Sequence, residues 1–304
     1  MSSTLGTRHS AQPAQPPRRS HLTLRPGTPV LARSPGVLQV GLDRPFLRVP
    51  DDPATRSLLA ALNRPGGVPG DPDVLPPASG RLLDDLQHAG LLVSLPDDQP
   101  LGDTRTVTLR AQFGGDAARR VRAREEAVVA VWADPATTSV VTALLERHGL
   151  RRTTCDDLDA SAHLLVTSGP LDREVADPLV RGSVPHLLVS GGAAGRRVGP
   201  FVEPGRTACL RCVDAHEALH DVRRPLLLAQ AARAAREQPP PLDPVLDELA
   251  LAWAVRDVAR YVEGDEPSTW STTVDIGPVA APEVVRWGRH PECGCAWDGF
   301  TLLP

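Results

Sequence analysis

The sequence predicts an α/β protein of two domains, a small α+β domain followed by a larger domain built on a parallel sheet. Three observations support this prediction. The chain has 304 residues, enough for two domains of ordinary size. Short β-rich runs and two amphipathic helical patterns fill residues 22–95. Beyond residue 125, apolar runs of strand length alternate with helical patterns, which is typical of a parallel sheet covered by helices.

The composition excludes several classes of protein. Hydrophobic residues make up 41% of the chain, but no apolar run approaches the roughly 20 residues that span a bilayer. The net charge of −4 argues against a surface that binds nucleic acid. All 33 basic residues are arginines, so no lysine can bind phosphate or form a Schiff base. Residues 1–21 lack the apolar segment of a secretory signal, and we expect a disordered tail on a cytoplasmic protein.

The first domain carries turn and cap signals between its elements. The stretch RSPG is a good turn between two strands, Asp52 and Pro53 suit a helix start, and Gly90 can end a second helix. The expected elements are strands at 29–32, 37–42 and 45–49, helices at 51–62 and about 82–89, and a strand at 91–95. They predict a small winged-helix-like domain over 22–95, followed by a linker and a basic helix over 96–124.

The second domain, expected over 125–304, alternates strands and helices. Its elements are strands at 127–133 and about 150–155, a helix at 134–149, strands at 161–169 and 184–192 around a helix at 172–182, a hairpin at 194–212, helices at 224–237 and 243–264, and closing strands at 269–277 and 283–291. The polar positions of the 243–264 helix share one narrow stripe, so most of that helix is expected to be buried.

Four of the five cysteines form two close pairs, Cys209 with Cys212 and Cys293 with Cys295. A C-x-x-C turn can direct two sulfurs at one ion, and glycine between the second pair gives that turn the freedom to do the same. Two such pairs in a cysteine-poor chain predict a structural, four-thiolate zinc site that fastens the C-terminal segment to the hairpin.

Other roles for these thiols are less favoured. A thioredoxin-like dithiol should follow the first strand of the domain, and a disulfide is unusual in a reducing compartment. His216, His220 and His290 lie near enough in sequence to substitute as ligands, but four cysteines already complete a tetrahedral site. The remaining Cys155 is expected to be a small core residue.

A parallel α/β domain with a late C-x-x-C and a C-terminal cysteine pair resembles the E1-like, ThiF-type adenylating superfamily, a Rossmann-type fold. The stretches GPFVEPGRTACLRCVDAHEALHD, RHPECGCAW and RPGTPVLARSPGVLQVGLD resemble an actinobacterial family, the bacteriocin-biosynthesis cyclodehydratases or leader-binding proteins of azole-modified (TOMM) peptides. The resemblance is weak between residues 125 and 192. It implies a ribosomal precursor peptide as ligand and a YcaO-type cyclodehydratase as partner enzyme, and it allows a homodimer.

The weak region is where an active relative binds ATP. A Gly-rich loop should follow the first strand, but here the turn reads VWADPATTSVV without glycine. Asp134 is placed to cap the helix with its own carboxylate, and Pro135 removes an N–H donor. We therefore expect no catalytic residue, no productive ATP binding and only a degenerate nucleotide site near Asp134, Thr137, Asp156, Asp157 and Arg151.

Leader-binding relatives capture a peptide by adding it as a strand beside a helix of the small domain. The corresponding edge here is RPFLRV, and the groove helix is RLLDDLQHAG. The residues expected to contact the peptide are Phe46, Arg48, Arg81 and Asp85. A DNA-reading winged helix would need a basic recognition helix, whereas this helix carries two aspartates and one arginine.

These observations predict a non-catalytic scaffold that binds a precursor peptide and presents it to a modifying enzyme. Two alternatives stay open at this point. The chain could be an active ATP-dependent adenylating or cyclodehydratase component with an unusual nucleotide site, or a zinc-stabilised regulatory protein without a part in peptide modification.

Overall fold

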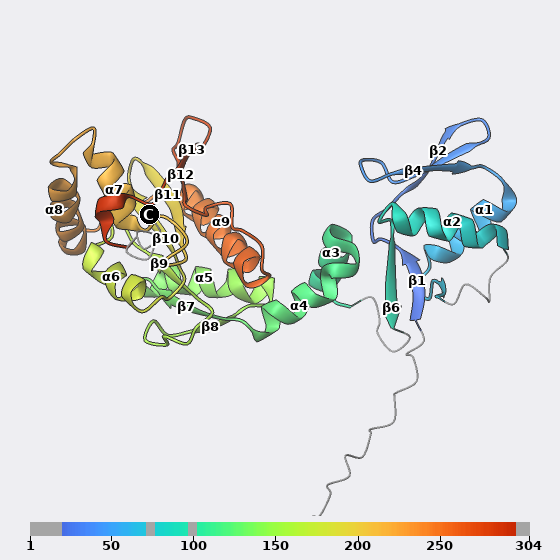
Figure 1. Cartoon of the computed structure of the whole chain (residues 1–304), viewed down its shortest axis with the longest axis horizontal. Coiled ribbons are helices and arrows are strands. Elements are labelled where there is room, and N and C mark those ends of the chain that lie inside the picture. The colour runs from blue at the N-terminus through green and yellow to red at the C-terminus, as the bar shows by residue number, and fades with distance from the viewer. Residues whose placement is uncertain (1–19, 71–76, 97–101, 296–304) are drawn as a thin grey trace, which may run out of the picture. The chain divides into compact units, whose positions relative to one another are not determined.

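A computed structural model describes residues 20–70, 77–96 and 102–295. The chain divides into two compact units, Met1–Ala118 and Arg119–Pro304, which are described separately (Figure 1). No helix in the described part of the chain is both long enough and apolar enough to cross a membrane.

In its described residues, the first unit contains two three-stranded antiparallel sheets and the helices α1, α2 and α3 (Figure 1). One sheet has the order β5-β1-β6 and the other β2-β3-β4, so β2 and β4 are its outer strands. The elements are β1 (Ser20–Leu24), β2 (Val30–Ser34), β3 (Val37–Val40), β4 (Leu47–Pro50), α1 (Pro53–Leu62), β5 (Val68–Pro69), α2 (Pro77–His88), β6 (Leu92–Pro96) and α3 (Thr104–Phe113).

Local signals fix the start of α1 and the end of α2 as the sequence predicts, whereas α2 starts about one turn earlier than expected, at Pro77. Asp52 caps α1, accepting a hydrogen bond from the Thr55 amide at 2.8 Å, and Pro53 occupies the first turn. Gly90 follows α2 with φ +70°, a left-handed conformation that glycine adopts without strain. Leucines of α1 and α2 share one core with residues of β1, β3, β4 and β6.

Two elements of the first unit differ from the prediction. Strand β1 begins at Ser20, inside the predicted tail. The sequence did not indicate this strand, because it is stabilised by pairing with β5 and β6, which come much later in the chain. Helix α3 lies in the predicted linker, and Arg25 of the segment after β1 donates to the Ala111 carbonyl of α3 at 3.0 Å. The winged-helix assignment itself stays a prediction.

The second unit is a seven-stranded sheet with helices on both faces (Figure 1). The strand order is β13-β12-β11-β10-β9-β7-β8, with β8, β7, β9 and β10 parallel and the rest antiparallel. Its strands are β7 (Val128–Trp132), β8 (Arg151–Thr153), β9 (Ala162–Val166), β10 (His186–Gly192), β11 (Gly195–Val202), β12 (Thr272–Ile276) and β13 (Glu283–Arg286). Its helices are α4 (Ala117–Glu126), α5 (Pro135–His148), α6 (Arg173–Arg181), α7 (Leu210–Ala218), α8 (Arg224–Glu237) and α9 (Pro244–Val262).

Alternating strand residues build a core on each face of this sheet. Leu164 and Leu187 face one core with residues of α5 and α9, whereas Leu165 and Leu188 face the other with residues of α6 and α7. The predicted burial of the long helix α9 holds only in part, because seven of its 19 residues are buried and Asp257 of the polar stripe is one of them. After β7, the chain adds β8 on one side and later β9 on the other, so the strand order reverses between β7 and β9.

Two predictions about cysteine positions are wrong in detail. The first pair does not lie on a hairpin, because β11 pairs with β10 and ends before the pair, and Cys209 instead caps α7. Cys155 is exposed in the loop after β8 and is not a core residue.

Candidate metal centre and neighbouring pockets

The start of α7 brings the first two thiols together. Cys209 precedes the helix with extended backbone, and the Cys212 amide donates to the Cys209 carbonyl at 3.0 Å. Residues three apart on a helical turn lie on one face, so their sulfurs are 3.7 Å apart. Both side chains are buried.

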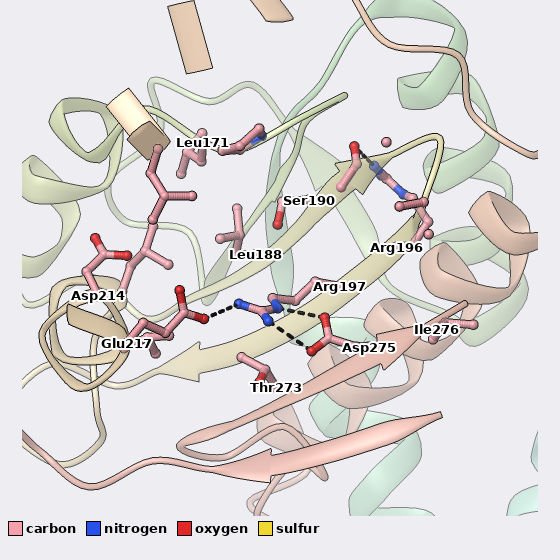
Figure 2. Close-up of a pocket in the computed structure, with 18 of the residues that line it drawn as sticks. Leu171, Leu188, Ser190, Arg196, Arg197, Asp214, Glu217, Thr273, Asp275 and Ile276 are labelled. Carbon is pink, nitrogen blue, oxygen red and sulfur yellow. Dashed lines mark hydrogen bonds and ion pairs between the residues drawn. The ribbon is translucent and has the colours of Figure 1, made fainter. Parts of the chain in front are cut away.

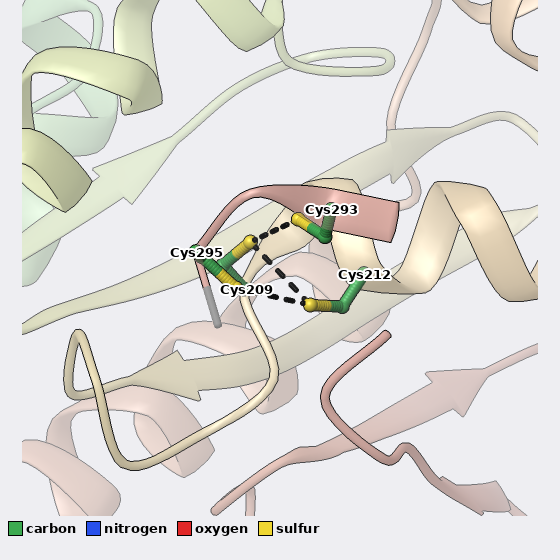
Figure 3. Close-up of side chains that lie close together, drawn as sticks. All are labelled: Cys209, Cys212, Cys293 and Cys295. Atoms are coloured by element: carbon green, nitrogen blue, oxygen red, sulfur yellow. Dashed lines mark hydrogen bonds between the residues drawn. The ribbon is translucent and has the colours of Figure 1, made fainter. Parts of the chain in front are cut away.

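The second pair arrives from the far end of the chain. The short 3-10 helix η3 (Pro291–Cys293) is followed by Gly294 in the left-handed region, φ +76°, and this turn points Cys293 and Cys295 at the first pair. The Cys209 and Cys293 sulfurs are 3.3 Å apart, as are those of Cys212 and Cys295 (Figure 3). All four sulfurs lie within 4.8 Å of one another.

This arrangement suits one tetrahedral metal ion. Zinc–sulfur bonds of about 2.3 Å place the sulfurs of a tetrahedron about 3.8 Å apart, within reach of the observed spacing. All five cysteines are free thiols. The structure therefore supports a four-cysteine cluster that could bind a metal ion.

The crowded thiols also influence one another's protons. Hydrogen bonds from the Cys209 thiol and the His290 amide lower the pKa of Cys212 to about 4, against the opposing effect of burial. The hydrogen bond with Cys212, together with burial, raises the pKa of Cys209. A divalent cation would displace the remaining protons, because thiols that coordinate a metal are deprotonated.

The histidines near the cluster contribute no atom to it. His290 has its imidazole against that of His216, with ring centroids 4.9 Å apart, and its Nδ1 accepts from the Glu292 amide at 3.3 Å. The His216 Nε2 lies 3.0 Å from the Gly288 carbonyl, and His220 is exposed. These contacts order the loop that carries the second cysteine pair.

A pocket of about 380 Å³ lies over β10, β11 and β12, beside α7 (Figure 2). Arg197 crosses it, donating to both carboxylate oxygens of Asp275 at 2.6 and 2.9 Å and to Glu217 at 2.9 Å. Arg224 donates to the second Glu217 oxygen at 2.9 Å. Because these charges neutralise one another, the pocket presents a paired network rather than a free catalytic acid or base.

A second cavity of about 380 Å³ lies at the carboxyl ends of β7 and β9, where nucleotides bind in related sheets. Asp134 accepts hydrogen bonds from the Ala136 and Thr137 amides at 3.0 and 3.1 Å, so the predicted cap is confirmed. The hydrogen bond from Thr137 holds the pKa of Asp134 below its ordinary value. A phosphate at this helix end would meet a carboxylate already in place.

The neighbouring helix has the same arrangement. Asp172 caps α6, accepting from the Glu174 amide at 3.1 Å, and its other oxygen lies 3.0 Å from Arg236 of α8. Ala232 and Ala235 of α8 also line this cavity, so α8 covers part of it. Both helix ends that face the cavity therefore carry their own carboxylates.

A buried ion pair occupies the same edge of the sheet. Arg196 is 2% exposed, and its Nη1 donates to the carbonyls of Thr167 and Gly191, which follow β9 and end β10, at 2.7 and 3.2 Å. Its Nε lies 3.0 Å from an Asp247 oxygen. Burial lowers the pKa of Arg196 and raises that of Asp247. Within the described residues, Nη1 is hydrogen-bonded to the protein, whereas the buried Nε and Nη2 have no hydrogen-bond partner.

The remaining residues of the predicted nucleotide site are divided between two edges of the sheet. Asp156 and Asp157 follow β8, at the same edge as Asp134. Arg151 pairs with Val128 at the opposite edge and donates to the carbonyls of residues 125 and 126 at 3.1 and 2.8 Å. Arg151 therefore cannot replace a phosphate-binding lysine at the edge that holds Asp134.

The predicted peptide-contacting residues lie around β4 and α2. Arg48 lies over the ring of Phe46, 5.7 Å from its centroid, and β4 pairs with β3 along one side only within the described residues. Helix α2 packs near β4 and exposes Arg81 and Asp85, which are four residues apart. The two pairs of residues thus belong to adjoining elements of one unit.

Sequence reasoning missed the residues of the Arg197 network. They come from β11, β12, α7 and α8, and no local motif joins them. Only the tertiary fold brings these charges into one pocket.

Comparisons with known proteins identify the fold. No family model and no curated protein sequence matches the chain. The heterocyclase TruD superposes with a TM-score of 0.68 at 16% identity, covering 91% of this chain and 43% of TruD. MccB of E. coli with MccA superposes with a TM-score of 0.62 at 13% identity, covering 91% of this chain and 99% of MccB. The chain has the fold of these proteins and spans less than half the length of TruD.

Proposed function

We propose that this protein binds a ribosomally made precursor peptide and holds it for a separate heterocycle-forming enzyme, without catalysing the modification itself. The observation that carries the proposal is the fold shared with TruD, a heterocyclase, and with MccB, which has been solved in complex with N-formylated MccA. An N-formyl group marks the start of a ribosomally made chain, so a protein of this fold holds a ligand of that class.

The β4 edge offers the peptide a place to bind. An extended segment could add to the open side of β4 through backbone hydrogen bonds, with its side chains directed toward α2. Arg48 and Phe46 would contact such a segment from the strand, and Arg81 and Asp85 from the helix. Backbone pairing would provide affinity, and these four side chains would provide selectivity.

The cavity at the carboxyl ends of β7 and β9 argues against an ATP-dependent step. Two helix ends that could hold phosphates carry the carboxylates of Asp134 and Asp172. The chain also has no lysine that could bind the phosphates in place of these helix ends. The protein would then supply binding and positioning only.

The four-cysteine cluster fits a structural role. Its sulfurs are supplied by α7 and by a segment more than 80 residues later, so a zinc ion would hold the C-terminal segment against the sheet domain. Zinc in such sites contributes on the order of 10 kcal/mol to folding. With four protein ligands, the ion would have no position open for a substrate.

The proposal includes a separate partner enzyme. TruD, which shares the fold over 43% of its length, is a heterocyclase. A YcaO-type cyclodehydratase acting on Cys, Ser or Thr would supply the chemistry of modification. We place this complex in the cytoplasm, in the biosynthesis of azole-modified, bacteriocin-like peptides.

One observation favours a second candidate, an ATP-dependent adenylating enzyme. MccB, which this chain covers almost completely, has been solved with AMPCPP and MccA. Isothermal titration of ATP–Mg into zinc-loaded protein, with AMP as control, separates the two candidates. If the protein is a scaffold, we expect no saturable heat of binding at millimolar nucleotide concentrations. Micromolar, magnesium-dependent binding would replace the scaffold with the enzyme.

The peptide arm of the proposal needs its own experiment, since the ligand sequence is not known. A random-peptide display selection against the full chain should enrich peptides that bind with micromolar or lower Kd. A parallel selection against Arg48→Glu should fail to enrich the peptides that use the β4 edge. Enriched peptides that bind this variant unchanged would place the peptide site elsewhere.

A further inference from the structure

A third cavity, of about 520 Å³, lies at the amino-terminal edge of the parallel strands, opposite the edge that holds Asp134. Its floor includes Ala127 and Ser161, which directly precede β7 and β9. The last turns of α4 and α9 and the loops after β11 and before β12 form its walls. Neither the metal centre nor the β4 edge contributes a residue to it.

Aromatic rings line one wall of this cavity. Tyr261 and Trp270 both face it and are 6.5 Å apart between ring centroids. Phe201, which is fully buried, lies 4.6 Å from Tyr261 and 6.0 Å from Trp270 and supports both rings from behind. The electron-rich faces of such rings attract cations.

Most of the charged residues that line the cavity are acidic. They are four acids and one arginine: Glu126, Glu203, Asp265, Glu266 and Arg206. Asp265 is already paired with Arg120, and Glu203 with Arg206. Within the described part of the chain, the side chains of Glu126 and Glu266 have no hydrogen bond or ion pair, so these two carboxylates are available to a ligand.

Arg206 already demonstrates how a cation is held here. Its guanidinium lies over Trp270, 5.4 Å from the ring centroid, and its Nη1 is 2.8 Å from a Glu203 oxygen. The Arg206 side chain is 67% exposed, so this contact is held only weakly against solvent. A second cation could share the cavity with it or displace it.

From this combination we infer that the cavity binds a cationic side chain, an arginine or lysine presented by a peptide or protein segment. Aromatic faces provide cation–π contacts, and the carboxylates of Glu126 and Glu266 neutralise the charge. The site is independent of the proposed peptide groove on β4 and of the metal centre. It would stand even if the scaffold function were wrong.

The test uses N-acetyl-arginine amide as probe, with N-acetyl-citrulline amide as its neutral counterpart. Both are titrated into the full chain while the indole N–H resonances are followed by NMR, and Trp270→Phe identifies the signal of Trp270. We expect a saturable shift of the Trp270 signal with the arginine probe, binding at least about threefold tighter than citrulline. The signal of Trp132, which lines the cavity at the opposite edge, should stay in place.

Three variants make the result specific. Removing two carboxylates with Glu126→Gln and Glu266→Gln should weaken the arginine probe, whereas Glu237→Gln with Glu248→Gln removes two exposed carboxylates elsewhere and should not. Arg206→Gln should strengthen binding, because it frees Trp270 and Glu203. Equal binding of citrulline and arginine, or no Trp270 shift in either the wild type or Arg206→Gln, would overturn the inference.

Discussion

The sulfur of Cys212 lies 3.3 Å from that of Cys295, although 83 residues separate them in the chain. The first belongs to the opening turn of α7 and the second to the turn that follows η3. Such a contact joins a sheet-domain helix to the last described segment of the chain. We therefore expect that removing a cysteine of this cluster lowers the free energy of unfolding more than a substitution at an exposed position does.

Metal content and stability should change together when the cluster is broken. Protein purified without added zinc should contain about one zinc ion per chain, and Cys209→Ser with Cys293→Ser should lose it. The free energy of unfolding should then fall by several kcal/mol, because metal binding contributes to the free energy of folding. Metal analysis and denaturant unfolding measure the two effects. The four tryptophans among the described residues lie in the second unit, so their fluorescence reports on that unit.

The control for the cluster is Cys155→Ser, since Cys155 is exposed and outside the set of four. It should retain the ion and unfold like the wild type. Zinc retained in the double variant instead would assign the ligands to His216 and His290.

Acid should destabilise the second unit through His186. Burial lowers the pKa of His186 to about 4, and the neighbouring His163, paired with it across β9 and β10, adds to this effect. The folded pKa is below the unfolded one, so this stability is fully present above pH 6.5 and is lost as pH falls toward 4. The expected loss from this group is about 3 kcal/mol.

The measurement is the slope of unfolding free energy against pH between 7 and 4. His186→Gln cannot take up the proton, so its curve should be shallower than the wild-type curve whatever its stability at pH 7. His220→Gln, an exposed position in the same unit, should leave the slope unchanged. A wild-type slope in His186→Gln would mean that this residue is not the titrating group.

The cap at Asp134 predicts a smaller effect. Asp134→Ala removes the acceptor for the Ala136 and Thr137 amides and should cost about 1 kcal/mol. Asp156→Ala, in an exposed loop at the same edge, should change stability by less than about 0.5 kcal/mol. Equal effects of the two substitutions in denaturant unfolding would show that the cap contributes nothing.

The β4 edge predicts a loss of peptide binding without a loss of stability. Arg48 is exposed, so Arg48→Glu should leave the unfolding curve unchanged while weakening a selected peptide about tenfold or more. Arg64→Glu makes the same charge change at an exposed position after α1 and serves as control. Fluorescence anisotropy of a labelled peptide measures both variants. Equal weakening by the two would indicate a general charge effect.

Much of the fold was predictable because local signals mark it. Asp52, Asp134 and Gly149 end or begin helices through contacts within a few residues, and the alternation of apolar strands with helices identified the parallel sheet. Strand β1 and helix α3 were missed because their partners, β6 and Arg25, are distant in sequence. Nothing within 20–24 itself signals a strand that pairs with 92–96.

The candidate site divides in the same way. The four cysteines were predictable because metal ligands come in close pairs of a rare residue type. The cation cavity was not, because Glu126, Glu203 and Trp270 come from three separate segments that no spacing pattern joins. The position of Arg151 could not be predicted either. The length of the α5–β8 connection decides at which edge of the sheet this residue lies.

The buried pair Arg196–Asp247 gives the sharpest test of how the carboxyl edge is built. Arg196→Met leaves Asp247 without its partner and removes the donor to the Thr167 and Gly191 carbonyls, so it should cost about 3–5 kcal/mol. Arg196→Met combined with Asp247→Leu removes both charges and should recover part of that loss. Denaturant unfolding of the four proteins gives the coupling energy directly. Additive losses would mean that the two charges do not stabilise each other.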